Sequence, residues 1–302
     1  MRAHQQGVAI ILAMGVVALA ALTASAMMTA QSTWLRQSEL TAEHVQAQTL
    51  IKVGVDWTRA LLSNDKRASN VDYLGEPWAL RLPPMPVENG ELSGHIDDQQ
   101  GVFNLNNLVR DGKVNIAQLA HFKRLLSILG LPPALADTLS DWIDADSEPQ
   151  GGAEDEFYRA LQPPYLAANR PLADVDELAL VRGFDDGVRA RLRPFVSALP
   201  VFTAVNVNTA SPEVIAAVID GIGLDGARAL VDKRDRSYFR DRTDLINQLP
   251  RDITVAAEDI SFSSDYFMVR MRVTIGSAQA RSVALLARPD ANWPIIVWRK
   301  ML

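Results

Sequence analysis

The chain has 302 residues, of which 48% are hydrophobic and 22% are charged, a composition that excludes a wholly disordered or fibrous protein. Its 30 Lys and Arg against 36 Asp and Glu give a net charge of −6, which disfavours extended binding to a phosphate backbone. Cysteine is absent and the four histidines are scattered. These counts exclude disulfides, thiol catalysis and cysteine-ligated metal centres.

A long apolar segment begins close to the N-terminus. No Asp, Glu, Lys or Arg lies between Arg2 and Arg36, and residues 8–30 would form a helix about 34 Å long, enough to cross a bilayer. The basic end is short and N-terminal, which predicts a single-pass anchor with the remaining chain translocated. The alternative is a cleavable signal peptide ending at Thr23-Ala24-Ser25-Ala26, whose apolar core would be only about 7–15 residues.

A second, amphipathic half of the same helix is predicted at residues 31–63. Residues 34–62 contain no proline, and apolar side chains recur there at three- and four-residue spacing. We expect Ser63-Asn64-Asp65 to end the helix and Pro83-Pro84-Met85-Pro86 to form a loop.

An antiparallel sheet is predicted on either side of a large insertion. Short strand-like runs at 78–82 and 91–97 lie in the first part, residues 64–102. In the last part, residues 252–302, the run 267–275 alternates without a break, Gly276-Ser277 supplies a turn and 278–288 returns. A last strand is expected at 293–299. The fold class is therefore α+β.

The insertion, residues 103–251, is predicted to be all-helical. Its Asn-rich segments 103–108 and 205–210 resemble each other, which indicates two small modules. Capping residues and prolines mark six helices: 116–129, 135–143, 174–180, 188–199, 212–219 and 225–233.

The second module looks like a helix-hairpin-helix, with Gly221-Ile222-Gly223 as its turn and Lys233-Arg234 after it. Such a hairpin presents backbone N–H groups to a phosphate. A membrane-anchored DNA receptor is therefore the alternative function. Residues 101–252 carry 17 Lys and Arg against 22 Asp and Glu, a net charge of −5, so nucleic acid is not expected as a partner.

A cluster of acidic residues follows the second predicted helix. No Lys or Arg lies between Arg124 and Arg159, and oxygen-rich loops of this kind suit Ca²⁺, which takes six to eight oxygen ligands. Pro149 stands where an EF-hand requires Gly, whereas Gly151-Gly152 let the chain fold back on itself. We predict one or two calcium ions; the alternative is a solvated acidic loop. The predicted ligands are Asp141, Asp144, Asp146, Glu148, Glu154 and Asp155.

The polar leader Gln6-Gly7-Val8 ahead of the apolar helix resembles that of type IV pilins and pseudopilins. In that family a prepilin peptidase cuts after the Gly and methylates the new N-terminus, which implies a leader of residues 1–7 and cleavage between Gly7 and Val8. The family usually has Glu at the fifth mature position, where this chain has Leu12. That departure and the large insertion resemble the K-type minor pseudopilin of type II secretion.

This resemblance implies a pilin-like helix on a sheet, with a helical insertion of two small SAM-like or helix-hairpin-helix-like modules. It also implies calcium in that insertion, through the segments Asp-Trp-Ile-Asp-x-Asp and Ala-Glu-Asp. The expected place is the tip of an inner-membrane-anchored periplasmic pseudopilus, where the chain helps to start or cap assembly and to export folded proteins. The implied partners are the I-, J- and H-type minor pseudopilins, prepilin peptidase, secreted substrates and the outer-membrane secretin. No catalytic residues are predicted, so the chain is not expected to be an enzyme.

Overall fold

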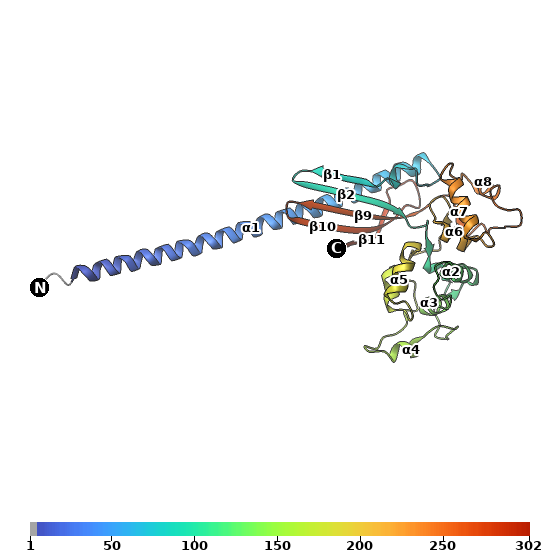
Figure 1. The fold of residues 1–302 in the computed structure, drawn as a ribbon, viewed down its shortest axis with the longest axis horizontal. Coiled ribbons are helices and arrows are strands. Elements are labelled where there is room, and N and C mark those ends of the chain that lie inside the picture. The colour runs from blue at the N-terminus through green and yellow to red at the C-terminus, as the bar shows by residue number, and fades with distance from the viewer. Residues whose placement is uncertain (1–4) are drawn as a thin grey trace.

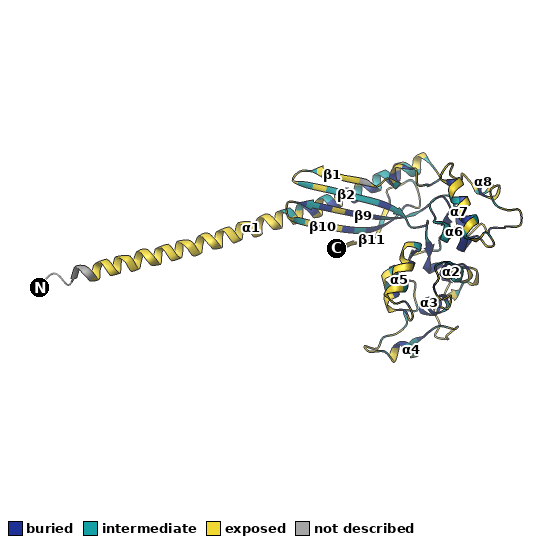
Figure 2. Ribbon diagram, viewed as in Figure 1, coloured by how far each residue is buried: buried dark blue, intermediate teal, exposed yellow. Residues whose placement is uncertain are grey.

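A computed structural model describes residues 5–302, and it shows a long helix that carries the rest of the chain at one end (Figure 1). This helix, α1, runs from Gln5 to Ala68. From Val8 onward its N-terminal part is exposed (Figure 2), and it is long and apolar enough to cross a membrane, with a mean hydropathy of 2.4 over 18 residues. Residues 1–4 of the predicted leader lie outside the described residues.

The C-terminal part of α1 packs on the sheet. Ala47, Ile51, Val55 and Leu62 are each at most 1% exposed and lie on one face at the helical period. The helix continues beyond Ser63-Asn64-Asp65, so the predicted end was wrong. The polar residues there make tertiary contacts that offset their weak helix preference: the Ser63 hydroxyl donates to the carbonyl of Ala291.

Five antiparallel strands form the sheet, in the order β1-β2-β9-β10-β11. Their side chains alternate, so that Phe267, Val269 and Val273 of β9 are fully buried against α1. The predicted combination of a helix and a terminal antiparallel sheet is confirmed. The strands are β1 (Leu82–Val87), β2 (Gly90–Asp98), β9 (Tyr266–Ile275), β10 (Ala278–Ala287) and β11 (Ile295–Met301).

Two expectations for the first part of the sheet were wrong. The proline-rich run 83–86 lies within β1, because β1 is an edge strand, where a missing N–H costs no ladder hydrogen bond. The expected strand at 78–82 begins as a 3-10 helix, Pro77–Ala79. Trp78 is 1% exposed there, and its Nε1 donates to Glu76.

The insertion lies between β2 and β9, beyond the end of the sheet that is farther from the N-terminus (Figure 1). Helix α5 ends well before residue 199, because a 3-10 helix containing Pro194 and then β6 follow it. Helices α4 and α8, five residues each, are too short for hydrophobic periodicity to reveal. The helices are α2 (Ile116–Ile128), α3 (Leu135–Ile143), α4 (Asp155–Arg159), α5 (Asp186–Leu192), α6 (Pro212–Val218), α7 (Gly223–Arg234) and α8 (Arg242–Ile246), with a 3-10 helix at Val175–Leu180.

Short strands complete the insertion and reveal its repeat. β3 (Phe103–Asn104) pairs in parallel with β6 (Val196–Ser197), just as β7 (Val205–Asn206) pairs with β8 (Ile260–Ser261). A further pair joins β4 (Val109–Arg110) to β5 (Lys113–Val114). Each Asn-rich segment therefore begins with a short strand that pairs in parallel with a later strand.

One asparagine side chain holds each module together. Asn106 accepts a hydrogen bond from the N–H of Leu172 at 2.8 Å and donates to its carbonyl at 2.9 Å. Asn208 makes the same two bonds with Phe239, both at 2.8 Å. A side-chain amide that satisfies both backbone groups of a remote residue fixes a loop without further secondary structure. The faint sequence repeat thus corresponds to a repeated structural device.

A buried arginine joins the stalk, the sheet and the loop between them. Arg288, which follows β10, is 0% exposed and lies between Asp65 at 2.7 Å and Asp72. It also donates to the carbonyls of Leu62 and Ser264, and its guanidinium lies 4.6 Å from the centroid of the Phe267 ring. Several charge-assisted hydrogen bonds compensate the cost of burying this cation.

Replacing Arg288 should therefore destabilise the fold strongly. The change Arg288→Met leaves Asp65 and Asp72 buried without a cation, which costs roughly 3–5 kcal/mol of unfolding free energy. Circular dichroism of the full-length chain in detergent, during denaturant unfolding, measures this loss. Arg299→Met, at an exposed position of β11, is the control and should change stability by less than about 0.5 kcal/mol. Equal stability of the two variants would contradict the role given to Arg288.

Candidate metal centre

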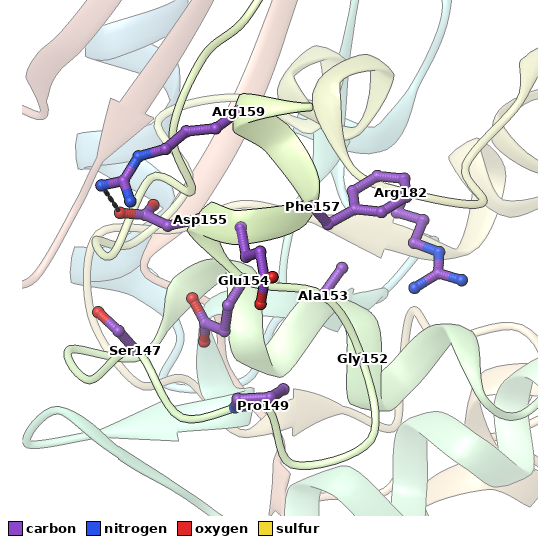
Figure 3. Close-up of a pocket in the computed structure, with 10 residues that line it drawn as sticks. Ser147, Pro149, Gly152, Ala153, Glu154, Asp155, Phe157, Arg159 and Arg182 are labelled. Carbon is purple, nitrogen blue, oxygen red and sulfur yellow. Dashed lines mark hydrogen bonds and ion pairs between the residues drawn. The ribbon is translucent and has the colours of Figure 1, made fainter. Parts of the chain in front are cut away.

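The acidic loop between α3 and α4 folds back on α3 (Figure 3). Asp141, fully buried in the last turn of α3, accepts hydrogen bonds from the backbone N–H of Gln150 and of Gly152. Gly151 has φ +112°, and a Cβ on Gly152 would lie 2.4 Å from Cα of Thr138. The two glycines therefore permit the close return that the sequence predicted, and Asp141 fixes it.

Three carboxylates meet where the loop closes. Asp144, Asp146 and Glu154 each place one oxygen within 4.8 Å of the others. Asp144 is 1% exposed and Glu154 is 6% exposed. Among the described residues, none of the four carboxylate oxygens of Asp144 and Glu154 has a hydrogen-bond partner. Buried carboxylates without partners are costly, and an oxygen-seeking cation would satisfy them.

Burial dominates the electrostatics of this group. It raises the pKa of Asp144 to about 6, with repulsion from Asp146 and Asp141 as the next cause. Burial likewise raises the pKa of Glu154 to about 7, followed by the charge of Asp144. An aromatic cluster behind the loop provides the apolar surroundings: the rings of Trp142 and Tyr158 lie 4.8 Å apart, edge to face.

The other predicted ligands lie apart from these three. Asp155 accepts from the N–H of Ala167 at 3.0 Å and pairs with Arg159 at 2.8 Å (Figure 3). Glu148 is exposed, and its N–H donates to Asp146. The fold thus brings Asp144, Asp146 and Glu154 together, with Asp141 beside them as the residue that organises the loop.

The donor set fits calcium. Carboxylate oxygens, here from a loop and from the residue that precedes α4, are the ligands that a hard cation of flexible geometry takes. A solvated acidic loop would expose its carboxylates, whereas Asp144 and Glu154 are buried.

A second group of carboxylates escaped the sequence analysis. Asp65, Asp72 and Glu76 also lie within 4.8 Å of one another, but each has internal partners. Arg288 binds the two aspartates, and Glu76 accepts from Trp78 and from the N–H of Tyr73. Burial raises the pKa of Glu76 to about 7. No sequence pattern could reveal this group, because Arg288 is more than 200 residues away in the chain.

The hairpin between α6 and α7 has the expected turn, with Gly221 at φ +79° and Gly223 at φ +64°. Of Lys233 and Arg234 after the turn, Arg234 points inward, since it is 7% exposed and donates to the carbonyls of Val207 and Ala210, whereas Lys233 is exposed. Beside the turn, Asp220 pairs with Arg124. Arg234 therefore serves the packing of the module, and the exposed Lys233 follows the exposed Asp232 in the chain.

The architecture is that of a pilin-like subunit with a two-module helical insertion. Family models of type II secretion system (T2SS) protein K match residues 101–201 and 205–261. Type II secretion system protein K of Pseudomonas aeruginosa is 37% identical and spans 95% of this chain and 90% of its own length. The protein of the same name from Klebsiella pneumoniae is 32% identical and spans 98% of this chain and 96% of its own length.

A solved structure agrees. The match lies in the crystal structure of the GspK–GspI–GspJ complex from the type 2 secretion system of enterotoxigenic Escherichia coli. Its TM-score is 0.78 at 25% sequence identity, and it covers 88% of this chain and 99% of that one. The chain belongs to the type II secretion system protein K family, the K-type minor pseudopilins, and the resemblance given by Leu12 and the insertion is confirmed. These are structural components of a secretion system, with no known enzymatic activity.

Without a metal ion, acid should stabilise this site. Asp144 and Glu154 have folded-state pKa values of about 6 and about 7, against ordinary values of about 4 in the unfolded chain. The folded state therefore binds protons more tightly, and this contribution to stability is complete below about pH 4 and is lost as the pH rises through about 7.

The test compares wild type with the double variant Asp144→Asn, Glu154→Gln, in chelator, by thermal melting. Near pH 4 the variant and the wild type should have the same melting temperature. Near pH 7.5 the variant should have the higher melting temperature, since only the wild type carries the buried charges at that pH. A difference in melting temperature that does not change with pH would contradict the raised pKa values.

Proposed function

We propose that this minor pseudopilin sits at the tip of a type II secretion pseudopilus, where it helps to start or cap assembly and to promote export of folded proteins. The position of the insertion carries this proposal. Its second module, helices α6 to α8, lies beyond the end of α1 that is farther from the membrane-spanning half, where a subunit stacked above would have to place its own stalk. Its first module, helices α2 to α5, lies to the side of that end (Figure 1). Leu12 adds support, because it provides no carboxylate to bind the N-terminal amine of a neighbouring subunit.

The N-terminus of α1 would anchor the chain in the inner membrane, with the sheet and the insertion in the periplasm. Arg2 at the short N-terminal end favours this orientation. Prepilin peptidase would remove residues 1–7 by cutting between Gly7 and Val8, followed by methylation of Val8. Gly7 and Val8 lie near the start of α1.

Other minor pseudopilins are the proposed partners. The related Escherichia coli protein occurs in a complex with GspI and GspJ, so the I and J types come first and the H type next. The stalk offers a surface for them: Val53 and Trp57 are 58% and 49% exposed. Secreted substrates and the outer-membrane secretin are the expected contacts of the insertion. The rival function is a DNA receptor that uses the α6–α7 hairpin.

Co-expression should recover the full-length chain with I- and J-type pseudopilins in detergent. The change Trp57→Arg should reduce this recovery, because it places a charge on the proposed stalk contact. Leu180→Arg is the matched control, since Leu180 is equally exposed at 49% but lies in the insertion. N-terminal sequencing of the recovered chain should begin at Val8. Absence of the partners, together with binding of duplex DNA at physiological salt, would favour the receptor.

Calcium is the proposed ion of the acidic loop, held by Asp144, Asp146 and Glu154. Bound there, calcium would supply positive charge to carboxylates that otherwise repel one another, and so fix the loop against α3. The role is structural. Asp141 holds the loop closed through its hydrogen bonds to the backbone N–H groups of Gln150 and Gly152. The three ligands would therefore lie close together before the ion binds.

Calcium should raise the melting temperature of the wild-type chain, with a stabilisation of roughly 2.7 kcal/mol at a hundredfold excess over its dissociation constant. The double variant Asp144→Asn, Glu154→Gln should lose this shift. Glu148→Gln, in the same loop but exposed, should keep it. A calcium shift that survives the double variant would place the ion elsewhere.

A further inference from the structure

The outer face of the sheet, opposite α1, carries a basic groove. Its cavity of about 330 Å³ crosses β2, β9 and β10 and is lined by Arg81, His95, Arg270, Arg272 and Arg281, with Leu302 also lining it. We call this surface the arginine groove. Such a concentration of arginine is unexpected on a chain whose net charge is −6.

Two of these arginines face each other across neighbouring strands. Arg272 of β9 and Arg281 of β10 are direct register partners, and on its other side Arg272 faces Ser93 of β2. Like charges directly opposite each other in an antiparallel pair destabilise a sheet. Both residues are exposed, so neither is needed to fill the core. The fold thus retains a repulsion that an anion in the groove would remove.

Internal acids neutralise only one side of the groove. Asp97 pairs with Arg270 and lies 3.4 Å from His95. Within the described part of the chain, Arg81, Arg272 and Arg281 have no ion pair within 4.0 Å. Arg281 donates only to Gln279, and the backbone N–H of Leu302 donates to its carbonyl. Unpaired guanidinium groups with planar donor forks are suited to carboxylates or phosphates.

The spacing of the arginines selects among anions. Arg270 and Arg272 are two residues apart on one strand, so their side chains leave the same face about 7 Å apart. An extended peptide with carboxylates at alternate positions has the same repeat.

We propose that the arginine groove binds an extended acidic segment of a partner protein, with carboxylates at alternate residues and the unpaired Arg272 and Arg281 as their main partners. This surface is separate from the acidic loop, and it adjoins the stalk contact, because His95 also lines the small cavity at Trp57. Its recognition does not depend on the tip position.

Fluorescence anisotropy of a short labelled peptide in which Glu and Thr alternate tests the proposal, with the full-length chain in detergent micelles. The peptide should bind more weakly as salt rises, and the peptide with Gln in place of Glu should not bind. The double variant Arg272→Gln, Arg281→Gln should weaken binding at least about tenfold, since it removes two charged hydrogen-bond donors. Arg299→Gln, an exposed arginine of the same sheet whose register partner Ala284 belongs to the inner face, should bind as wild type does.

Thermal melting of the same variants separates binding from folding. The double variant should melt no lower than the wild type, because it loses a like-charge pair and no buried contact. Equal binding of the Glu and Gln peptides, or unchanged binding by the double variant, would overturn the proposal. Displacement of the peptide by an equimolar amount of inorganic phosphate, or by phosphatidylglycerol vesicles, would also overturn it and assign the groove to a phosphate group.

Discussion

The burial of one arginine charge is the constraint on which the arrangement of this molecule depends. Arg288 can remain inside only where acids and carbonyls surround it, and those groups come from the end of the stalk, the following loop and the segment before β9. Asp98 extends the same polar centre toward the insertion, since it accepts from Ser264, Thr209 and Asn206. The stalk, the sheet and the second module are therefore joined by hydrogen bonds between buried polar groups, each of which would be costly to bury without its partners.

The two groups of neighbouring carboxylates differ in whether the chain itself supplies their partners. Asp72 and Glu76 are buried, Asp65 is half-buried and the three lie close together, yet hydrogen bonds and Arg288 satisfy them from within the chain. Asp144 and Glu154 are as deeply buried and have no such partners among the described residues. The spacing of acidic residues in the sequence does not show which carboxylates have partners, because the partners are residues that the fold brings within hydrogen-bond distance.

Charge is distributed unevenly over the molecule in a way that suits a subunit with several neighbours. The exposed half of α1 is apolar, the loop before α4 is acidic, and the outer sheet face is basic at Arg272 and Arg281. Each surface favours a chemically different contact: lipid or another stalk helix, a cation, and an acidic segment. The apolar half of α1 and the arginine groove are exposed, which leaves both available for assembly.

The sequence by itself determined the features that depend on local periodicity and on short spacings. The apolar run 8–30, the alternation of 267–275 and the glycine pair 151–152 specify the stalk, a central strand and the returning loop, because helix, strand and turn each impose a period or a backbone angle on nearby residues. The Asn-rich repeat was visible for the same reason, although its hydrogen bonds were not.

Only the tertiary structure decided which polar groups meet. It continued α1 past Ser63-Asn64-Asp65, placed a proline run in an edge strand, and separated Glu148 and Asp155 from Asp144, Asp146 and Glu154. It also brought Arg288 to Asp65. These outcomes depend on contacts between residues that are remote in the chain, or on how a loop closes, and no local propensity contains that information.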